Sequence, residues 1–524
     1  MTNTFENPIL SGFYPDPTIC RVDDNYYLAT SSFVYFPGIP IFHSKDLIHW
    51  EQIGHAIHRI GQLDYKNCET SLGLWAPSLH YHNGLFYLIN TFVSECREAR
   101  RDNYIVTAKN PTGPWSDPIF IEEADGIDSS LFFDTDNRMW YTGNYIHNDS
   151  EYEGHHGIYL CELNPITFQF IGNRSVIWDG AKTRSKWIEA PHLYKKNGYY
   201  YLMVAEGGTF TNHSVMMARS KIIDGDYEIC PRNPIISHRH LSLTNPISVV
   251  GHGDIVETQN GEWWMVLLGI RPYSGFHFNL GRETFLVPVI WAEDGWLRID
   301  NENGIVNQFE RLPNLTNHVF PYIASTDHFE AKSLHFVWNT IHPPVELFYS
   351  LTKRNSYLRL CLTPNTISEI TTPSFVGRRQ QHKYFQATTA LEFTPKSDSE
   401  EAGLAFIQDD RFNYIYVKGR EHSNNYLRLY QTENGTLTLL YEEAIESKER
   451  IYLTVQATNE FYQFYYGFRE HEYHNFYVPV TATLLSSNVN EGFTGCYLGM
   501  YATSNHTSSQ NYADYDWFSY LGIK

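Results

Sequence analysis

Three carboxylic acids stand in similar local contexts although they are far apart in the chain. Asp16 lies in PDPTICR, Asp128 in IDSSLFF and Glu189 in EAPHLYK, each just before or at the start of a strand-like run. Carboxyl groups that converge in one pocket shift one another's pKa values, and groups with different pKa values can serve as general base and general acid. These residue types therefore allow acid–base catalysis, provided that the fold brings the three strand starts together.

The elements that carry these acids follow an internal repeat. A turn with aromatic residues recurs as DNYYL at 24–28, NGLFYL at 83–88, NRMWY at 137–141, NGYYYL at 197–202 and NGEWWM at 260–265. Its aligned aromatic residues, spaced by 60, 54, 60 and 63 positions, are Tyr27, Tyr87, Tyr141, Tyr201 and Trp264. Each turn joins two short strand-like runs and a third run follows. Five such units predict a five-bladed β-propeller, because a β-sandwich alone would not explain a fixed period.

The repeat places the three acids at equivalent positions. Counting back 11 to 13 residues from each aromatic anchor leads to Asp16, Trp75, Asp128, Glu189 and His252. Each opens the first strand of its unit, and in a propeller that strand is the innermost one. An acid at a strand start is usually a turn or solvent residue, and a lone tryptophan is often part of a core. The shared register nevertheless favours one common pocket at one end of the channel.

A second domain follows the repeat. The repeat stops near residues 309–327, where the proline-containing segment FERLPNLTNHVFPYIASTDHFE indicates a linker. Alternating runs then recur, such as YLRLCLT, FQATTALEF, AGLAFIQ, NYIYVKG and RIYLTVQA, and they predict a β-sandwich. We therefore expect an all-β protein with a five-bladed β-propeller in residues 1–315 and a β-sandwich domain in residues 325–524.

The composition narrows the class of protein. Aromatic residues make up 16% of the 524 residues, which suits strands and also suits sugars, because aromatic faces stack on pyranose rings. A net charge of −20 disfavours nucleic acids and anionic membranes as partners. The segment MTNTFENPIL lacks the features of a signal peptide, no apolar run reaches the roughly 20 residues that span a bilayer, and seven scattered cysteines suggest reduced thiols. We therefore expect a cytoplasmic location.

These motifs resemble glycoside hydrolase family 43, and most closely its β-xylosidases. The resemblance covers nearly the whole chain and rests on NPILSGFYPDPTICRVDDNYYLATSSF, GIDSSLFFD, WIEAPHLYKKNGYYYL and AEGGT. It implies that Asp16 is the general base, that Asp128 tunes and orients the acid, and that Glu189 is the general acid. One departure is Ser129, which follows Asp128 where many relatives have proline.

The same resemblance implies substrate contacts around the acids. The implied residues are Phe33, Trp75, Ala76, Thr209, His252 and Arg282. The segments PSFVGRRQQH, EEAGLAFIQDDRFNY and ADYDWFSY resemble the accessory sandwich of these enzymes, in which a phenylalanine closes the sugar pocket. Phe493 in GFTG is the candidate, and a core aromatic at a strand start is the alternative.

We expect no required cofactor and no metal in the catalytic site. Calcium is an optional ligand of the sandwich, where Asp327, Glu330 and Asp516 are the candidate acids, although acidic strand caps are the commoner use of such residues. Some relatives hold a metal in the central channel near the equivalent of His252, and this alternative stays open here.

The implied chemistry is hydrolysis of a glycosidic bond between two carboxyl groups. Asp16 takes a proton from water, Glu189 protonates the leaving oxygen, and Asp128 disfavours ionisation of Glu189 by like charge. Arg282 fixes sugar hydroxyls or forms a structural salt bridge. The sequence thus predicts an exo-acting, inverting hydrolase that releases terminal xylose from β-1,4-xylo-oligosaccharides, with α-L-arabinofuranosidase side activity.

Other functions are weighed against this one. An α-L-arabinofuranosidase or arabinanase of the same fold would have a similar site, because xylopyranose and arabinofuranose present similar hydroxyl patterns. A non-catalytic carbohydrate-binding propeller would lack an acid, whereas all three are present. A retaining fructosidase-type propeller pairs its acid with an EC motif after RDP, whereas Glu95–Cys96 precedes the RDN tripeptide at 101–103. We expect a xylo-oligosaccharide as partner, no nucleic acid, no membrane, and a homo-oligomer.

Overall fold

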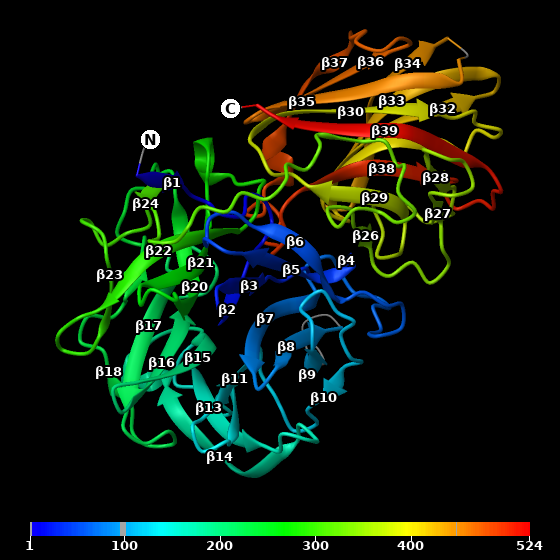
Figure 1. The fold of residues 1–524 in the computed structure, drawn as a ribbon. Coiled ribbons are helices and arrows are strands. Elements are labelled where there is room, and N and C mark those ends of the chain that lie inside the picture. Colours follow the sequence, from blue (N-terminus) through cyan, green and yellow to red (C-terminus); the bar gives the residue numbers. More distant parts are fainter. Residues whose placement is uncertain (1–2, 95–100, 447, 524) are drawn as a thin grey trace.

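The chain folds almost entirely into β-strands, which form two lobes (Figure 1). The structure is a computed structural model that describes residues 3–94, 101–446 and 448–523. Glu95 and Cys96, the pair that the fructosidase alternative would need, lie outside the described residues. Helical structure in the described part is limited to short 3₁₀ turns, namely η1 (Gly180–Lys182), η2 (Ser274–Phe276) and η3 (Ala482–Leu485). No helix there is long and apolar enough to cross a membrane.

The first lobe is a ring of five antiparallel sheets, each built from consecutive stretches of the chain. The first and second blades contain β2 (Thr18–Val22), β3 (Asn25–Ala29), β5 (Gly38–Ser44) and β6 (Glu51–Ile57), then β7 (Gly73–His82), β8 (Leu85–Val93), β9 (Arg101–Ala108) and β10 (Ile119–Phe120). The third contains β11 (Ser130–Phe133), β12 (Met139–Ile146), β13 (His156–Leu163) and β14 (Phe170–Asp179). The fourth contains β15 (Glu189–Lys196), β16 (Tyr199–Glu206), β17 (Ser214–Ser220), β18 (Glu228–Ile229) and the extra β19 (Ile236–Ser237). The fifth contains β20 (Ser248–Glu257), β21 (Trp263–Ile270), β22 (Glu283–Trp291) and β23 (Leu297–Ile299). The predicted five-bladed propeller is confirmed.

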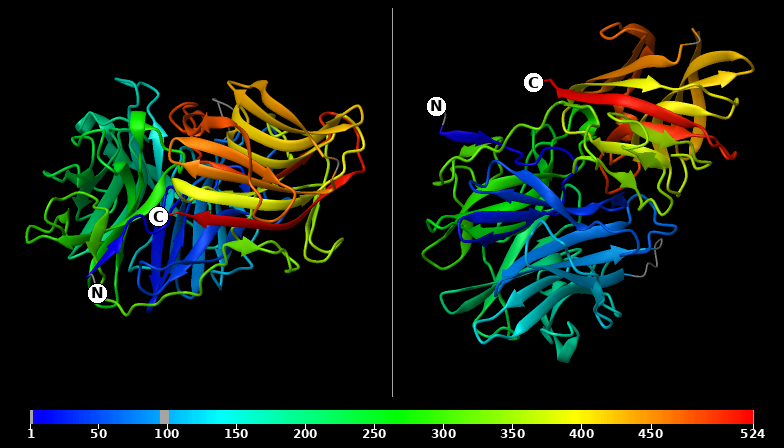
Figure 2. Two further views of the ribbon diagram at one scale, coloured as in Figure 1. Left: turned by 90° about the horizontal axis from the view of Figure 1, so that it is seen from above. Right: turned by 45° about the vertical axis from the view of Figure 1, so that its right-hand side comes forward.

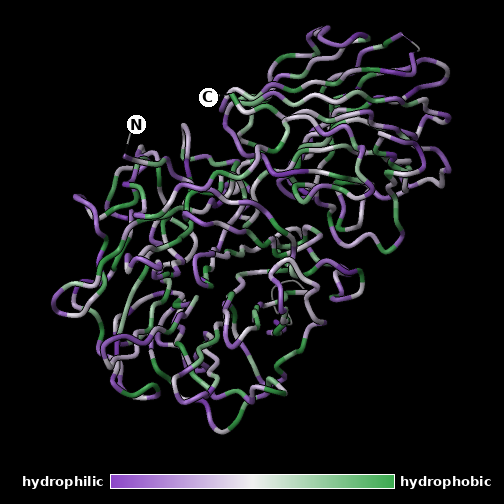
Figure 3. The backbone as a smooth tube through the Cα atoms, in the orientation of Figure 1, coloured by the Kyte–Doolittle hydropathy of each residue, from purple (hydrophilic) through white to green (hydrophobic). Residues whose placement is uncertain are grey.

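The turns of the repeat explain the inner hairpin of each blade. Asn83–Gly84 and Asn197–Gly198 have positive φ at both residues, with values of 49° and 81° in the first pair and 50° and 78° in the second. A two-residue turn of this kind matches the twist of the strands it joins, and Asn–Gly adopts it at little cost. The strands then alternate in hydropathy, so that colours change repeatedly along the tube in Figure 3. The apolar faces pack between blades, as where Ile158 of the third blade meets Val204 of the fourth.

A buried carboxylate links the last blade to the first. Asp254 on β20 accepts hydrogen bonds from the Thr18 hydroxyl and the Ile19 N–H, both at 2.9 Å. It also accepts a hydrogen bond of 2.6 Å from the Tyr194 hydroxyl of the fourth blade. Outside the ring, β1 (Thr4–Glu6) pairs with β24 (Phe309–Arg311) and ties the two ends of the propeller segment together.

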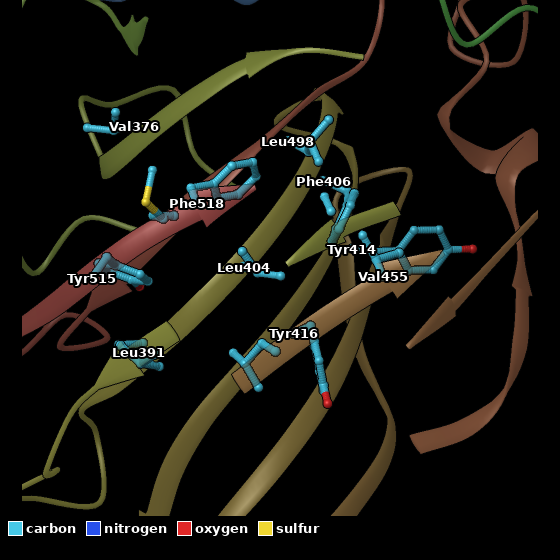
Figure 4. Close-up of a cluster of buried hydrophobic side chains, with 14 of the residues drawn as sticks. Val376, Leu391, Leu404, Phe406, Tyr414, Tyr416, Val455, Leu498, Tyr515 and Phe518 are labelled. Atoms are coloured by element: carbon cyan, nitrogen blue, oxygen red, sulfur yellow. The ribbon is translucent and has the colours of Figure 1, made fainter. Parts of the chain in front are cut away.

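The second lobe is a sandwich of two antiparallel sheets. One sheet has the order β27 (Tyr349–Ser350), β28 (Leu358–Cys361), β39 (Tyr512–Gly522), β30 (Tyr384–Glu392), β35 (Arg450–Thr458), β36 (Phe461–Gly467) and β37 (His474–Thr481), with β25 (Thr326–Asp327) beside β39. The other has the order β29 (Ser374–Arg379), β38 (Tyr497–Thr503), β31 (Glu401–Asp409), β32 (Phe412–Glu421), β33 (Asn424–Glu433) and β34 (Thr436–Ile445). Figure 4 shows side chains of both sheets, such as Phe406 and Val455, meeting in a buried core. The predicted sandwich is thereby confirmed.

The two lobes are in direct contact, as the views in Figure 2 agree. The short strand β26 (Thr340–Ile341) pairs with β4 (Tyr35–Phe36), which belongs to a loop of the first blade. The Cys496 N–H donates to the Asn279 carbonyl at 2.8 Å, and the Phe278 N–H donates to the Ser486 hydroxyl at 2.7 Å. Backbone groups of the sandwich are thus fixed against a propeller loop, so a side chain of the sandwich can take a defined place at the propeller surface.

Candidate active site

One cavity of about 210 Å³ brings together all ten residues that the sequence singled out. It is bordered by the starts of the inner strands on one side and by the sandwich on the other. These ten residues are Asp16, Phe33, Trp75, Ala76, Asp128, Glu189, Thr209, His252, Arg282 and Phe493. The register argument from the repeat therefore leads to one pocket.

An unusual backbone conformation marks the strand starts that form this cavity. Side chains with a Cβ rarely adopt positive φ, and such residues cluster at functional sites because the surrounding fold must hold them there. Six non-glycine residues at the cavity or beside it have φ between 50° and 55°, namely Asp16, Phe33, Asp128, Trp187, Ala190 and His252. The fold thus holds Asp16 and Asp128, and Ala190 directly after Glu189, in strained positions at the pocket.

Asp16 is held by two donors. The Arg282 guanidinium donates to one of its carboxylate oxygens at 2.6 Å, and the Ser31 hydroxyl donates to the other. The His252 Nδ1 lies 3.9 Å from Asp16, but burial lowers the pKa of His252 to about 4, so its imidazole is neutral at neutral pH. The positive partner of Asp16 is therefore Arg282. This arrangement suits a carboxylate that accepts a proton from water.

The other two acids have raised pKa values. Burial raises the pKa of Glu189 to about 7, with repulsion from Asp16 adding to the shift and the charges of Arg282 and Arg101 opposing it. Burial, and then repulsion from Glu189 and Asp16, raises the pKa of Asp128 well above its usual range. A carboxyl group that keeps its proton up to neutral pH suits a general acid, which is the chemistry expected of Glu189.

Burial and mutual repulsion both affect the acids Asp128 and Glu189. We expect Asp128 to disfavour ionisation of Glu189 by like charge, and this role stays a prediction. Burial and the charge of Asp16 raise the pKa of Glu189, and burial together with the charges of Glu189 and Asp16 raises the pKa of Asp128. The next residue, Ser129, donates from its hydroxyl to the Asn103 side chain at 3.0 Å, so the departure from proline provides an anchor to the second blade.

Phe493 belongs to the sandwich and yet faces the catalytic cavity. Its ring centroid is 5.7 Å from that of Trp75 and 6.3 Å from that of Phe33. Its carbonyl accepts a hydrogen bond of 3.3 Å from Arg282, the partner of Asp16. Its side chain is 37% exposed, which excludes the core-aromatic alternative. Phe493 lies in the loop between η3 and β38, where it covers the pocket from the sandwich side.

The loop that carries Phe493 is anchored on both domains. The Phe493 N–H donates to the Ser71 hydroxyl of the propeller at 3.0 Å. On the sandwich side, the Asn490 amide donates to Asp409 at 2.7 Å and its carbonyl oxygen accepts from the Gly492 N–H at 2.8 Å. These bonds restrict the loop, so the position of the Phe493 ring depends on the packing of the two domains.

A second cavity of about 460 Å³ adjoins the first. The two share residues of their lining, including Trp187, Thr209 and Phe493. The sandwich contributes polar groups to the second cavity through Asn488 and Glu491. A molecule longer than one sugar unit can therefore extend from the catalytic cavity into the space between the domains.

Four further residues line the catalytic cavity, and the sequence reasoning did not name them as site residues. They are Ile127, His156, Trp187 and Gly208. Ile127 directly precedes Asp128, and Trp187 lies two residues before Glu189. Their positions beside the predicted strand starts could therefore have indicated that they line the cavity. Gly208 stands in the quoted segment AEGGT beside Thr209. His156 opens the third strand of its blade, and no sequence pattern marks that position as facing the pocket.

Two of the three acids considered for calcium have other partners in the structure. Asp327 accepts hydrogen bonds from the Phe329 N–H and the Trp338 indole N–H, both at 2.8 Å. Asp516 pairs with Arg450 at 2.7 Å. The group in the described chain with the spacing of metal ligands lies elsewhere, at His147, His155 and Asp179. The optional calcium set of Asp327, Glu330 and Asp516 stays a prediction.

An all-β propeller with carboxyl groups of different pKa in a sugar-sized cavity defines the class of glycoside hydrolases. The chain belongs to glycosyl hydrolases family 43, whose family model matches residues 5–297. Residues 326–521 match the model described as the beta xylosidase C-terminal concanavalin A-like domain. The resemblance in the motifs is thereby confirmed for both domains.

Known relatives resemble the chain over its whole length. A xylosidase/arabinosidase of Butyrivibrio fibrisolvens is 40% identical over 518 residues, which is 98% of each chain. A non-reducing end alpha-L-arabinofuranosidase of Bacteroides ovatus is 37% identical and covers 99% of this chain and 94% of its own. The crystal structure of a xylan beta-1,4-xylosidase of Bacillus halodurans superposes with a TM-score of 0.93 at 37% identity, covering 99% of this chain and all of the other.

Proposed function

We propose that this hydrolase removes the terminal xylose from β-1,4-xylo-oligosaccharides by single displacement with inversion, and that it also cleaves α-L-arabinofuranosides. This proposal rests on one observation, namely that Asp16 and Glu189 line the same small cavity. Asp16 is bound by Arg282, whereas the pKa of Glu189 is raised to about 7. The names of the relatives, which include xylosidases and an arabinofuranosidase, support a pentose as the terminal sugar.

The division of labour follows from the two carboxyl groups. Water attacks the anomeric carbon while Asp16 accepts the proton of that water, and Glu189 donates its proton to the glycosidic oxygen as the bond to the leaving sugar breaks. Arg282 orients Asp16, and the strained backbone at Asp16 directs that carboxylate to the pocket. Inversion needs room for the water, so we expect the two carboxyl groups to lie roughly 6.5–9.5 Å apart in the substrate complex.

The size of the cavities supports exo action. At about 210 Å³ the catalytic cavity is smaller than the roughly 300–1,000 Å³ of pockets for drug-sized ligands, and it suits one monosaccharide. The Phe493 ring covers the cavity beside Phe33 and Trp75, so a chain cannot continue past these three rings. The adjoining cavity of about 460 Å³ then holds the leaving part of the substrate, near Asn488 and Glu491.

An assay of paired aryl glycosides tests the proposal. The purified protein is given 4-nitrophenyl β-D-xylopyranoside and 4-nitrophenyl α-L-arabinofuranoside under the same conditions. We expect hydrolysis of both, with a higher kcat/KM for the xyloside, and release of xylose from xylobiose. A preference for the arabinofuranoside would favour the arabinofuranosidase named among the relatives. A folded protein that cleaves neither glycoside would overturn the proposal.

We also propose a cellular location and an oligomeric state for the enzyme. The six cysteines of the described residues are free thiols, which suits a reducing compartment such as the cytoplasm. Fractionation of the producing cells would check the location. The homo-oligomer expected from the sequence stays a proposal, which light scattering of the purified protein would check.

A further inference from the structure

His156 is a polar residue in the catalytic cavity that the mechanism above does not use. It is the first residue of β13, it is half-buried, and it lines the same cavity as Asp128, Glu189 and Trp187. Its Nδ1 is buried and has no hydrogen-bond partner. Buried polar atoms are nearly always paired, so an unpaired one on a residue that lines a binding cavity needs an explanation.

The imidazole of His156 is neutral at neutral pH. Burial, together with the charges of Arg101, His155 and His147, lowers the pKa of His156 to about 4. A neutral imidazole has one N–H donor and one acceptor nitrogen, which matches the donor and acceptor character of a sugar hydroxyl. By contrast, the polar groups of Asp16 and Arg282 in the same cavity already bind each other.

A stack of aromatic rings supports the segment that precedes His156. The His147 and His155 rings are stacked with centroids 3.9 Å apart, and the Tyr152 ring stacks on His155 at 4.8 Å. Asp179 accepts a hydrogen bond of 2.9 Å from the His155 Nε2, and it also caps η1 through the Ala181 N–H at 2.9 Å. The loop between β12 and β13 is thereby fixed to the end of β14.

The same loop contacts Trp187, which also lines the cavity and has no role in the mechanism above. The Trp187 N–H donates to the Gly154 carbonyl at 2.8 Å. Gly154 has φ of 77°, and a Cβ there would come within 2.9 Å of the Trp187 indole nitrogen, so only glycine allows this approach. His156 and Trp187 are therefore held by one supported loop, and neither is free to adopt another position without breaking these contacts.

The histidine and aspartate stack does not fit a metal ion as it stands. The ligand atoms of His147, His155 and Asp179 lie within 4.8 Å of one another. However, the Glu151 N–H donates to the His155 Nδ1 at 3.3 Å, so the proton of that ring is on Nε2 and is donated to Asp179. A metal at Nε2 would need the opposite tautomer. The stack therefore acts as a structural support.

We propose that His156 is a specificity-determining residue that hydrogen-bonds one hydroxyl of the terminal sugar. This inference rests on the proposed function, because it assigns a contact to the pentose in the catalytic cavity. The ring stack supports the segment before His156 and so fixes the position of the imidazole. A hydroxyl must therefore lie at the right place on the sugar to form this hydrogen bond.

The test combines variants of His156 with altered substrates. His156→Phe keeps a ring of similar shape and removes the hydrogen bond, His156→Gln restores a donor and an acceptor, and His422→Phe on the sandwich surface is the control. The kcat/KM of each protein is measured on 4-nitrophenyl β-D-xylopyranoside and on its 2-, 3- and 4-deoxy analogues. We expect His156→Phe to lose roughly tenfold on the parent xyloside, and His156→Gln to recover part of that loss.

The deoxy analogues separate recognition from structure. For the one analogue that lacks the hydroxyl bound by His156, we expect His156→Phe and the wild type to have the same kcat/KM, because the interaction is already absent. An equal loss on all four substrates, or no loss on any, would overturn the inference while leaving the proposed function intact. A wild-type protein that cleaves no pentoside would instead overturn the proposed function.

Discussion

At the residue scale, Asp16 and Glu189 have different surroundings. The Arg282 guanidinium lies 2.6 Å from Asp16, whereas burial raises the pKa of Glu189 to about 7. One group is thus suited to accept a proton and the other to donate one. Because the two side chains come from the first and fourth blades, the difference in surroundings is produced by the fold and not by their local sequence.

Replacing either group removes its proton transfer. We expect Asp16→Ala and Glu189→Ala each to lower kcat/KM on xylobiose by about 10²–10⁴-fold. With an aryl leaving group the loss for Glu189→Ala is smaller, because such a group needs less protonation. Circular dichroism checks that the variants are folded. Retention of more than about a tenth of the wild-type rate on xylobiose would remove that residue from its role.

The pH dependence reports on Glu189 and Asp128 together. Glu189 is protonated below its raised pKa, so we expect kcat to be high below pH 7 and to fall as the pH rises through about 7. Because burial and the charge of Asp16 are what raise the pKa of Glu189, Asp128→Asn should leave this alkaline limb in place even if it lowers the rate. A limb that moves to lower pH in Asp128→Asn would show that an ionised Asp128 raises the pKa of Glu189 after all.

At the element scale, the loop of Phe493 connects the sandwich to catalysis. The ring lies beside Trp75 and Phe33, and the Phe493 carbonyl accepts a hydrogen bond from Arg282. The loop is anchored through Ser71 and Asn490. The accessory domain therefore contributes a wall of the sugar cavity, and this wall is missing if the loop is displaced.

Truncation of this ring tests the contribution of the sandwich. We expect Phe493→Ala to raise KM for xylobiose and to weaken inhibition by xylose, with little change in Tm, because the cavity loses a face but the 37% exposed ring is not core. Phe461→Ala, which removes an exposed phenylalanine from β36, is the matched control and should change neither value. Unchanged kinetics in Phe493→Ala would leave the sandwich with a purely structural role.

The elements also show what could be predicted from the sequence. The repeat of Asn–Gly turns and aromatic anchors was sufficient to predict the blades, and the shared register located Asp16, Asp128 and Glu189 in one pocket. His156 could not be found in this way, because its position depends on how the loop from residue 147 to 155 packs on Asp179. The main cause of the raised pKa of Asp128 also escaped prediction, since that cause is burial in the folded protein.

At the scale of the whole molecule, one buried carboxylate joins three blades of the ring. Asp254 of the fifth blade accepts hydrogen bonds from Thr18 and Ile19 of the first blade and from Tyr194 of the fourth. All of these bonds lie near the axis of the ring, where the inner strands of the blades meet. Loss of this carboxylate leaves buried donors without partners and loosens the ring that positions the three acids of the cavity.

Replacement of Asp254 should therefore destabilise the protein. We expect Asp254→Ala to lower the free energy of unfolding by about 3 kcal/mol or more, because several buried donors lose their acceptor together. The fall in Tm is measured by calorimetry and compared with Asp226→Ala, where the carboxylate is fully exposed. Equal Tm values for the two variants would show that the ring does not depend on Asp254.

The stereochemistry of the first product tests the central claim most directly, because it depends on the roles of Asp16 and Glu189 in the assembled cavity. Proton NMR follows the hydrolysis of a β-xyloside during the first minutes, before mutarotation mixes the anomers. If Asp16 activates water and Glu189 protonates the leaving oxygen, the signal of α-xylose grows first. Early growth of the β-xylose signal, or transfer of xylose to added methanol, would contradict the account and would make a carboxylate of this pocket a nucleophile.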